Sequence, residues 1–463
     1  MRQTGTLVET QVAKAEQAPD RIAFSYLDGE CEIIHQLSNL QLHQRAAAIA
    51  SKLQKTTSPS DRILLLFPQG LAFISAFLGV IYSGSIPVVV APPRSGKPDS
   101  AQVRDIQSIV NATDVSIVLT NDAILDNVAQ CFFNSKTLSE ISFFSVDEID
   151  NDLMHSWSMP RIENNSVAYL QRTSAGTEIP KFVMISHDNI KNTLERFQCS
   201  CQLDRSSRSL SWLPHYHYLG LLLGVLAPIY YGFKGYIASE FTFFQNPYYW
   251  LTAISRYGIT FSGAPNFAYS LCVEHAPNSS QNFLDLSKWN TAYISAELIK
   301  KETIERFFEK FSCCGLDKAA LMPIYGLAES AHVASNVGAF SVPETISGGA
   351  IGCIPGDADS QNQNGVRQIT SISCGLPTTD TSITIAHPKT REKCSDLEIG
   401  EVFVKSDCAA AGYWNRPEET ARVFGIYFDG SSDGPYMSTG DLGFLKNGEV
   451  HIVSKLEGYK HSS

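Results

Sequence analysis

The sequence predicts an α/β fold with two layered αβ subdomains followed by a small β-rich, barrel-like subdomain. The length of 463 residues suggests about three folding units at roughly 150 residues per domain. The first half alternates short apolar strand patterns with helical patterns, and the helical periods end near Gly348. The predicted subdomain boundaries are residues 1–167, 168–347 and 348–455.

The elements of the first subdomain follow a strand–helix alternation. Strands are expected at residues 63–67, 86–90 and 115–120, and helices at residues 40–53 and 71–82. Because these strands are apolar throughout, they are typical of a parallel sheet that is covered on both faces.

Two uncharged stretches raise the question of a membrane span. Residues 63–93 contain no charge and exceed the ~20 residues that cross a bilayer. Turn residues at 68–70 and 83–85 interrupt this stretch, and residues 209–233 contain Pro214 and several glycines. Both stretches are therefore interpreted as interior segments.

The third subdomain is predicted from a change of pattern. Short β-rich segments at residues 382–386 and 402–405 are separated by Gly, Pro and Asp residues. The polar stretch 356–365 has no apolar period and is expected to be a mobile loop.

Composition limits the class of partner. There are 36 basic and 47 acidic residues, and the net charge of −11 disfavours nucleic acid and anionic lipid. The 11 cysteines are scattered without a CxxC pair, so we expect no zinc frame but reduced thiols in a cytoplasmic protein. A small molecule or a protein is the favoured partner.

Residues 169–187 are the most informative segment. An apolar strand enters, a Ser/Thr/Gly loop follows, and Lys181 comes just after the loop. Hydroxyls, backbone N–H groups and an ammonium at a strand exit are the groups that hold polyphosphate. Taken alone, the segment also fits an ordinary polar loop.

Further motifs make this segment specific. The loop TSAGTEIPK (173–181) resembles the adenylate-forming superfamily's T-S-G-S-T-G-x-P-K-G, and YGLAE (325–329) and YMSTGD (436–441) resemble its Y-G-x-x-E and aromatic-x-x-T-G-D motifs. Three motifs in the right order are more specific than one, and the resemblance covers nearly the whole chain. Four segments resemble the fatty acyl-AMP ligases within the superfamily: SWLPHYH (211–217), SGAPNFAY (262–269), GYWNRPEET (412–420) and TGDLGFL (439–445).

The resemblance implies the fold of an adenylate-forming N-terminal domain and a ligase activity. ATP would activate a fatty acid to acyl-AMP with Mg²⁺ and release of pyrophosphate, for transfer to an acyl carrier protein in lipid or polyketide biosynthesis. Attack of a carboxylate on a phosphate brings two anions together, so positioning and charge neutralisation would carry most of the catalysis.

The motif positions imply a set of nucleotide-binding residues. Tyr325 would pack on adenine, and Asp441 would accept hydrogen bonds from both ribose hydroxyls. Glu329 would hold Mg²⁺, which binds one or two carboxylates together with phosphate oxygens and water. The implied nucleotide set is Thr173, Ser174, Thr177, Lys181, Glu297, Tyr325, Gly326, Asp441 and Lys455, and its first four members would face the β- and γ-phosphates.

A second set is implied for the acyl chain. His217 would lie near the carboxylate end of an acyl tunnel and, with Lys181 and Glu329, form the catalytic set. Singly, Tyr325 also fits a core aromatic and His217 a satisfied interior histidine, but such roles do not explain the ordered motifs. The implied acyl-contacting residues are Trp212, His217, Gly220, Ala264, Pro265 and Phe267.

The chain departs from the family pattern at several positions. Ala175, Glu178 and Phe182 replace glycines in the phosphate loop, and Glu178 brings a carboxylate toward polyphosphate. We therefore predict that Glu178→Gly raises ATP affinity or rate. Lys455 stands where the family has a ribose-contacting arginine, so a point charge replaces a planar fork.

The family continues into a C-terminal lid that supplies a catalytic lysine. Residues 456–463 are expected to be a hinge remnant with the lid absent, and turnover without the lid would be weak. An insertion that restrains the lid in the ligases would fall near residues 347–373. Two alternatives stay open, a degenerate relative that binds acyl chains or adenylates without catalysis and an acyl-CoA synthetase.

Overall fold

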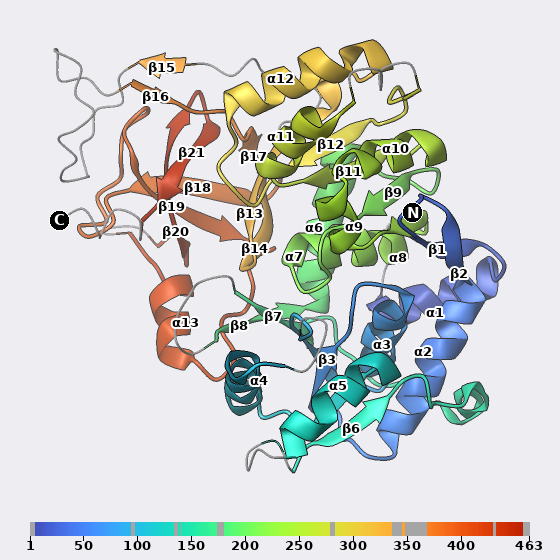
Figure 1. The fold of residues 1–463 in the computed structure, drawn as a ribbon. Helices are drawn as coiled ribbons and strands as arrows, with labels where there is room; N and C mark the ends of the chain where they lie inside the picture. The colour runs from blue at the N-terminus through green and yellow to red at the C-terminus, as the bar shows by residue number, and fades with distance from the viewer. Residues whose placement is uncertain are drawn as a thin grey trace. The chain divides into compact units, whose positions relative to one another are not determined.

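The computed structural model describes residues 5–93, 98–133, 138, 140–173, 180–277, 283–335, 345–347, 368–428 and 432–456. The chain forms two compact units. The first comprises residues 1–191, 204–245 and 413–417, and the second comprises residues 192–203, 246–412 and 418–463. Figure 1 labels their elements along the chain.

The first unit contains a six-stranded sheet in the order β6-β5-β3-β4-β7-β8. All neighbours pair in parallel except β7 and β8, which are antiparallel. The strands are β3 (Arg62–Leu66), β4 (Ile86–Val89), β5 (Ile117–Thr120), β6 (Ser142–Ser145), β7 (Val167–Arg172) and β8 (Phe182–Ser186). The helices that follow β4, β5 and β3 are α4 (Ser100–Thr113), α5 (Asp122–Phe133) and α3 (Leu71–Tyr82).

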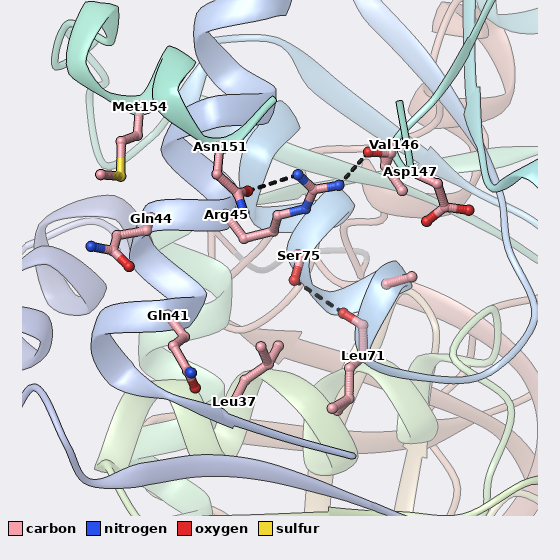
Figure 2. A pocket seen from close by; sticks show the side chains of 11 residues that line it. Leu37, Gln41, Gln44, Arg45, Leu71, Ser75, Val146, Asp147, Asn151 and Met154 are labelled. Carbon is pink, nitrogen blue, oxygen red and sulfur yellow. Dashed lines mark hydrogen bonds between the residues drawn. The ribbon is translucent and has the colours of Figure 1, made fainter. Parts of the chain in front are cut away.

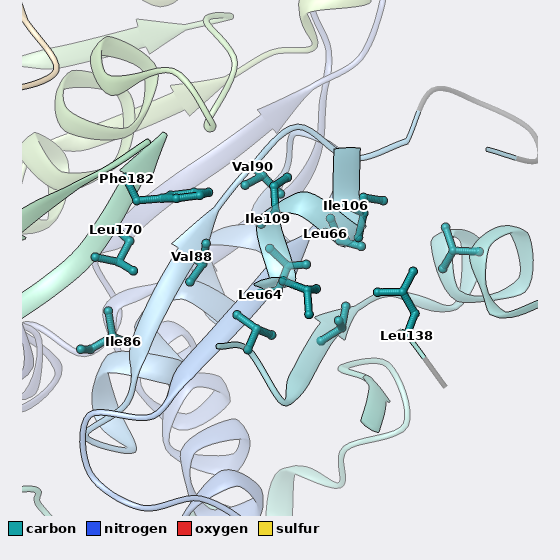
Figure 3. Packing of buried hydrophobic residues seen from close by; sticks show 14 residues of the cluster. Leu64, Leu66, Ile86, Val88, Val90, Ile106, Ile109, Leu138, Leu170 and Phe182 are labelled. Atoms are coloured by element: carbon teal, nitrogen blue, oxygen red, sulfur yellow. The ribbon is translucent and has the colours of Figure 1, made fainter. Parts of the chain in front are cut away.

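Apolar strand residues form the core of this sheet. Leu64, Val88 and Leu170 are fully buried and pack with Ile106 and Ile109 of α4 (Figure 3). The predicted strands and the predicted helix 71–82 are confirmed, and both stretches without charge are interior. Among the described residues, no helix is long and apolar enough to cross a membrane.

The first unit also holds a layer of four strands in the order β9-β10-β1-β2. β1, β10 and β9 run parallel, and β2 is antiparallel to β1. Helix α2 starts at a capping box in which Ser38 and Gln41 exchange hydrogen bonds. The elements are α1 (Leu7–Gln17), β1 (Ile22–Leu27), β2 (Ile33–Ser38), α2 (Asn39–Gln54), η1 (Asn151–Ser156), β9 (Arg208–Ser211), α7 (Tyr218–Leu221), the π-helix η2 (Leu222–Leu226), α8 (Ala227–Tyr231), β10 (Lys234–Ile237) and α9 (Glu240–Gln245).

The second unit contains a sheet in the order β17-β14-β13-β12-β11. β11, β12 and β13 are parallel, and β14 and β17 continue the sheet antiparallel. The aromatic rings of Trp250, Tyr269, Trp289 and Phe307 pack edge to face or stacked in its core. The elements are α6 (His187–Cys201), which begins in the first unit, α10 (Tyr248–Tyr257), β11 (Phe261–Ala264), α11 (Asn266–His275), β12 (Thr291–Ile294), α12 (Lys301–Phe311), η4 (Ser312–Cys314), η5 (Lys318–Ala320), β13 (Leu321–Leu327), β14 (Ser330–Ser335) and β17 (Leu376–Pro377).

A four-stranded antiparallel sheet, β18-β19-β20-β21, confirms the β-rich character predicted for the last part of the chain. Val402, Met437 and Val450 are buried between its strands and β13. The predicted loop 356–365 lies outside the described residues, and the subdomain boundaries stay a prediction. The elements are β15 (Thr345–Ser347), β16 (Gln368–Thr370), β18 (Thr381–Ala386), β19 (Gly400–Ser406), α13 (Pro417–Phe424), β20 (Met437–Lys446) and β21 (Glu449–Lys455).

Candidate functional site

Three motif residues meet in the second unit. The Tyr325 hydroxyl on β13 donates to Asp441 Oδ2 on β20 at 2.8 Å, and Lys455 Nζ on β21 lies 2.5 Å from Asp441 Oδ1. Asp441 and Lys455 are register partners of the antiparallel pair, which places their side chains together. Asp441 is 4% exposed and Tyr325 is 7% exposed. The sequence prediction that these residues share one site is therefore compatible with their geometry.

Burial and the neighbouring carboxylate determine the state of Tyr325. Desolvation, followed by the charge of Asp441, raises the pKa of the Tyr325 hydroxyl well above its usual value. Tyr325 is therefore a neutral donor. The Asp441 carboxylate thus has one oxygen facing a phenol and the other facing an ammonium, and each oxygen keeps lone-pair capacity for a further donor.

The part of β20 just before Asp441 is held by a second carboxylate. Glu401 on β19 is 3% exposed and accepts hydrogen bonds from the Ser438 hydroxyl and the Gly440 N–H. Gly440 has a φ of +69°, a conformation that favours glycine. The Thr439 hydroxyl donates to the Val402 carbonyl at 2.7 Å and accepts from the Asp441 N–H at 3.0 Å. These contacts fix the backbone that presents Asp441.

Gly326 and Glu329 lie in the hairpin that joins β13 and β14. A Cβ on Gly326 would lie 2.2 Å from the Ala331 carbonyl oxygen, so the hairpin requires glycine there. The Glu329 side chain is half-buried in the turn. The backbone carbonyl of Glu329 accepts a hydrogen bond from the Ala410 N–H at 2.9 Å. A single carboxylate suits Mg²⁺, which takes its other ligands from phosphate and water. The described residues contain no group of three His, Cys, Asp or Glu side chains that could hold a metal by themselves.

Two further predicted residues line one pocket of about 390 Å³ in the second unit. The Phe267 N–H, in the first turn of α11, donates to Glu297 Oε1 at 2.5 Å. Ala264 ends β11 and is buried, and Pro265 precedes the first residue of α11. Glu297 is exposed and contacts a helix N-terminus in this structure, so its proposed role toward the nucleotide is not visible in its own contacts.

In the first unit, the ends of β7 and β8 flank the predicted phosphate loop. The Thr173 N–H donates to the Lys181 carbonyl at 3.0 Å, which closes the base of the loop. The Thr173 hydroxyl is buried and has no hydrogen-bond partner among the described residues. Lys181 Nζ lies 5.8 Å from the centre of the Tyr413 ring, a cation–π contact. Ser174 and Thr177, as well as Ala175 and Glu178, lie outside the described residues.

The histidine segment after β9 is largely interior. Burial lowers the pKa of His217 to about 4, and its Nδ1 accepts the Leu219 N–H at 3.3 Å, capping α7. A Cβ on Gly220 would lie 2.1 Å from the Pro214 carbonyl oxygen. The Trp212 ring stacks on Phe243 with ring centres 3.7 Å apart. His217 is therefore a neutral imidazole at physiological pH.

Sequence reasoning missed two side chains beside these residues. His215 is 4% exposed, both of its ring nitrogens lack a partner among the described residues, and burial lowers its pKa to about 3. Gln171 is buried and donates to the Tyr216 carbonyl at 2.8 Å. In the sequence, Gln171 and His215 are polar residues within largely apolar segments, and this pattern could have indicated them as site residues.

A pocket of about 380 Å³ in the first unit is lined by none of the predicted site residues that the structure describes (Figure 2). Arg45 extends along it and donates to the carbonyls of Val146 and Ile149 and to the Asn151 amide oxygen. The hydrogen bonds of the Arg45 guanidinium therefore connect helix α2 to the residues that follow β6. This pocket is not the one that the motifs indicate.

Comparison with known proteins identifies the family. Residues 12–414 match the family model described as AMP-binding enzyme. The chain therefore belongs to the AMP-binding enzyme family, and its resemblance to the adenylate-forming superfamily is confirmed.

Two of the similar proteins are named as ligases of fatty acids. The chain is 34% identical over 457 residues to the medium-chain-fatty-acid–[acyl-carrier-protein] ligase JamA of Moorena producens, covering 98% of this chain and 77% of JamA. It is 30% identical over 458 residues to the long-chain-fatty-acid–AMP ligase FadD28 of Mycobacterium tuberculosis, covering 96% of this chain and 78% of FadD28.

A solved structure is similar throughout the chain. The fatty acyl-adenylate ligase from L. pneumophila, in complex with acyl adenylate and pyrophosphate, superposes with a TM-score of 0.87 and 34% sequence identity. The match covers 98% of this chain and 78% of that chain. The predicted α/β fold of an adenylate-forming N-terminal domain is confirmed.

Proposed function

We propose that this protein uses ATP to activate a fatty acid as acyl-AMP, releasing pyrophosphate, and that an acyl carrier protein then receives the acyl group. The observation that carries the proposal is the buried Asp441 carboxylate between Tyr325 and Lys455, at positions where the family binds the nucleotide sugar and base. JamA, a similar protein, is an acyl-carrier-protein ligase. Because JamA and FadD28 are named as ligases, a non-catalytic binder is not favoured.

Each proposed nucleotide contact uses a group of suitable chemistry. The Asp441 carboxylate would accept hydrogen bonds from the ribose hydroxyls. It would use the oxygen lone pairs that its contacts with Tyr325 and Lys455 do not occupy. Lys181 and the Thr173 hydroxyl, which has no hydrogen-bond partner in the described part of the chain, would face the β- and γ-phosphates. Ser174, Thr177, Gly326 and Glu297 complete the proposed nucleotide set.

A magnesium ion would offset the charge between the approaching carboxylate and the triphosphate. Glu329 is the residue proposed to hold it, because one carboxylate with phosphate oxygens and water suits Mg²⁺. The chain's own part is to fix the phosphates with Lys181 and the sugar with Asp441, so that the acid meets the α-phosphorus in line.

The acyl group is proposed to pass along the segments after β9 and β11. Trp212, His217 and Gly220 follow β9, and Ala264, Pro265 and Phe267 follow or end β11. His217, neutral through burial, would stand near the substrate carboxylate as a hydrogen-bond partner without adding a competing charge. Cytoplasmic localisation stays a prediction.

Pyrophosphate release tests the proposal. The protein is incubated with ATP, Mg²⁺ and a panel of medium- and long-chain fatty acids, and Asp441→Asn is compared with Asp285→Asn, an exposed aspartate that bonds Ser287 in its own turn. We expect release that depends on fatty acid and falls at least tenfold in Asp441→Asn only. ATP binding without release for every acid would support the binder instead. Acyl transfer to coenzyme A rather than to a carrier protein would support the acyl-CoA synthetase.

A further inference from the structure

A basic pocket of about 480 Å³ lies in the first unit, where three parallel strands begin. β1 begins at Ile22, β9 at Arg208 and β10 at Lys234. The parallel pairing of β1 with β10 and of β10 with β9 brings these amino ends to one edge of the sheet, with Arg208 and Lys234 as register partners.

Four cationic side chains line this basic pocket: Arg21, Arg205, Arg208 and Lys234. The described residues that line it include no carboxylate. Asp204 is adjacent in sequence, but its carboxylate accepts hydrogen bonds from Ser206 and Ser207 within its own turn. In a protein with a net charge of −11, this is a local reversal of sign.

The cations are close enough to disfavour one another. Burial, followed by the charges of Arg205 and Arg21, lowers the pKa of the neighbouring Lys14 to about 7. The pKa of Lys234 is also lowered, first by burial and then by Arg208. A bound anion would relieve this repulsion.

The position of the pocket separates it from the proposed ligase site. The carboxyl end of β9 leads to Trp212 and His217, whereas the pocket lies at the amino end of the same strand. Parallel α/β sheets bind their substrates outside the carboxyl ends of the strands. Of the residues proposed for ATP or the acyl chain, none that the structure describes lines the basic pocket.

We propose that this basic pocket binds a small anion through a phosphoryl group. Arginine guanidinium groups match phosphate oxygens with paired, charge-assisted hydrogen bonds, and Lys234 adds a point charge held over the Tyr236 ring at 4.6 Å. Four cations suit an anion with more than one negative charge. The volume is in the range of small-molecule pockets, which favours a small ligand over a macromolecule.

Calorimetric titration with inorganic phosphate at constant ionic strength tests the proposal. The full chain carries Lys181→Ala throughout, so that the proposed ATP phosphate loop does not contribute. Arg21→Gln with Arg205→Gln is compared with Arg104→Gln plus Arg422→Gln, a control pair with the same change of charge at other surface positions. We expect the Kd for phosphate to rise at least tenfold in the pocket variant and less than twofold in the control. If the double variant unfolds at a lower temperature than the parent protein, the single variant Arg205→Gln replaces it, and a smaller rise of the Kd is expected.

Three results would overturn the proposal: no phosphate binding by the parent protein, an unchanged Kd in the pocket variants, or equal weakening in pocket and control variants. Acetate binding as tightly as phosphate would also overturn it, because a phosphoryl site should prefer the higher charge. Phenyl phosphate, titrated in the same way, distinguishes the source of the ligand. Tighter binding than phosphate supports an esterified ligand, and weaker binding supports free phosphate.

Discussion

Asp441 is the residue on which the proposed nucleotide site most depends, and its two oxygens face unlike partners. Lys455 is 71% exposed at its side chain, so water screens its ion pair with Asp441. The Tyr325 hydroxyl is buried and bonds the other oxygen at 2.8 Å. A hydrogen bond from a buried neutral donor to a charged acceptor is worth roughly 1.5–3 kcal/mol. Tyr325 should therefore position Asp441 more strongly than Lys455 does.

Tyr325→Phe should raise the KM for ATP several-fold and lower the free energy of unfolding by about 1–3 kcal/mol, because a buried carboxylate loses a donor. Tyr269→Phe is the matched control. The Tyr269 hydroxyl is also buried but donates at 2.9 Å to the neutral Tyr293 carbonyl. The control should lose stability without a change of KM. Steady-state kinetics and urea unfolding give the two quantities, and an unchanged KM in Tyr325→Phe would contradict the assigned role.

Lys14 should make the stability of the protein depend on pH. It is 7% exposed, its ammonium donates to the Tyr230 carbonyl at 2.9 Å, and its pKa falls from 10.5 to about 7, through burial first. The unfolded chain therefore binds more protons than the folded protein between those two pH values. The free energy of unfolding should rise as pH rises through this window.

Replacing Lys14 by Met removes this proton linkage. The free energy of unfolding of Lys14→Met minus that of the parent protein should fall by ~2 kcal/mol between pH 7 and pH 9, since each pKa unit is worth about 1.4 kcal/mol. Chemical unfolding at each pH measures the difference, with Lys55→Met as an exposed-lysine control. A difference that does not vary with pH would show that Lys14 titrates normally.

At the scale of elements, the β13–β14 hairpin carries Tyr325 near the end of β13 and Glu329 in its tight turn. The register between the strands shifts between Tyr325 and Leu327, which brings Gly326 against the Ala331 carbonyl. The obstacle there is backbone, which cannot rotate away as a side chain can. The hairpin therefore depends on the absence of a side chain at Gly326.

Gly326→Ala should cost about 1–3 kcal/mol of unfolding free energy through overpacking, and it should reduce ATP turnover because Tyr325 and Glu329 would shift. Gly29→Ala is the control, since a Cβ there would meet nothing within 4 Å. Gly29→Ala should leave both quantities nearly unchanged. If Gly326→Ala is as stable and active as the control, the turn is not as tight as described.

The sequence predicts features that arise from a local apolar pattern, but not contacts between residues that are distant along the chain. The strand at residues 63–67 and the helix at 71–82 could be predicted because burial on both faces leaves apolar runs in the sequence, as in β3 and α3. The Tyr325–Asp441 bond could not be derived from periodicity, because its partners are distant in sequence and only the family motifs suggested a shared site. Glu401, which fixes the Gly440 backbone, was missed since one acidic residue in a β-rich stretch gives no signal.

At the scale of the whole molecule, the proposed nucleotide residues belong to different parts of the chain. Thr173 and Lys181 belong to the first unit, and Glu329 and Asp441 belong to the second. That they contact the triphosphate, metal and sugar of one ATP molecule stays a prediction. Holding the phosphates and the sugar of one nucleotide in place would favour in-line attack by the fatty acid carboxylate.

Direct detection of acyl-AMP by mass spectrometry is the most direct test of this account. The protein is mixed with Mg²⁺, a fatty acid and either ATP or 2′,3′-dideoxy-ATP, and the parent chain is compared with Lys181→Ala and Asp441→Asn. We predict that the parent chain forms acyl-AMP and strongly prefers ATP. Lys181→Ala should lower the yield with both nucleotides, and Asp441→Asn should abolish the preference for ATP. Absence of acyl-AMP with every fatty acid, or an Asp441→Asn variant that still prefers ATP to the same degree, would contradict the account.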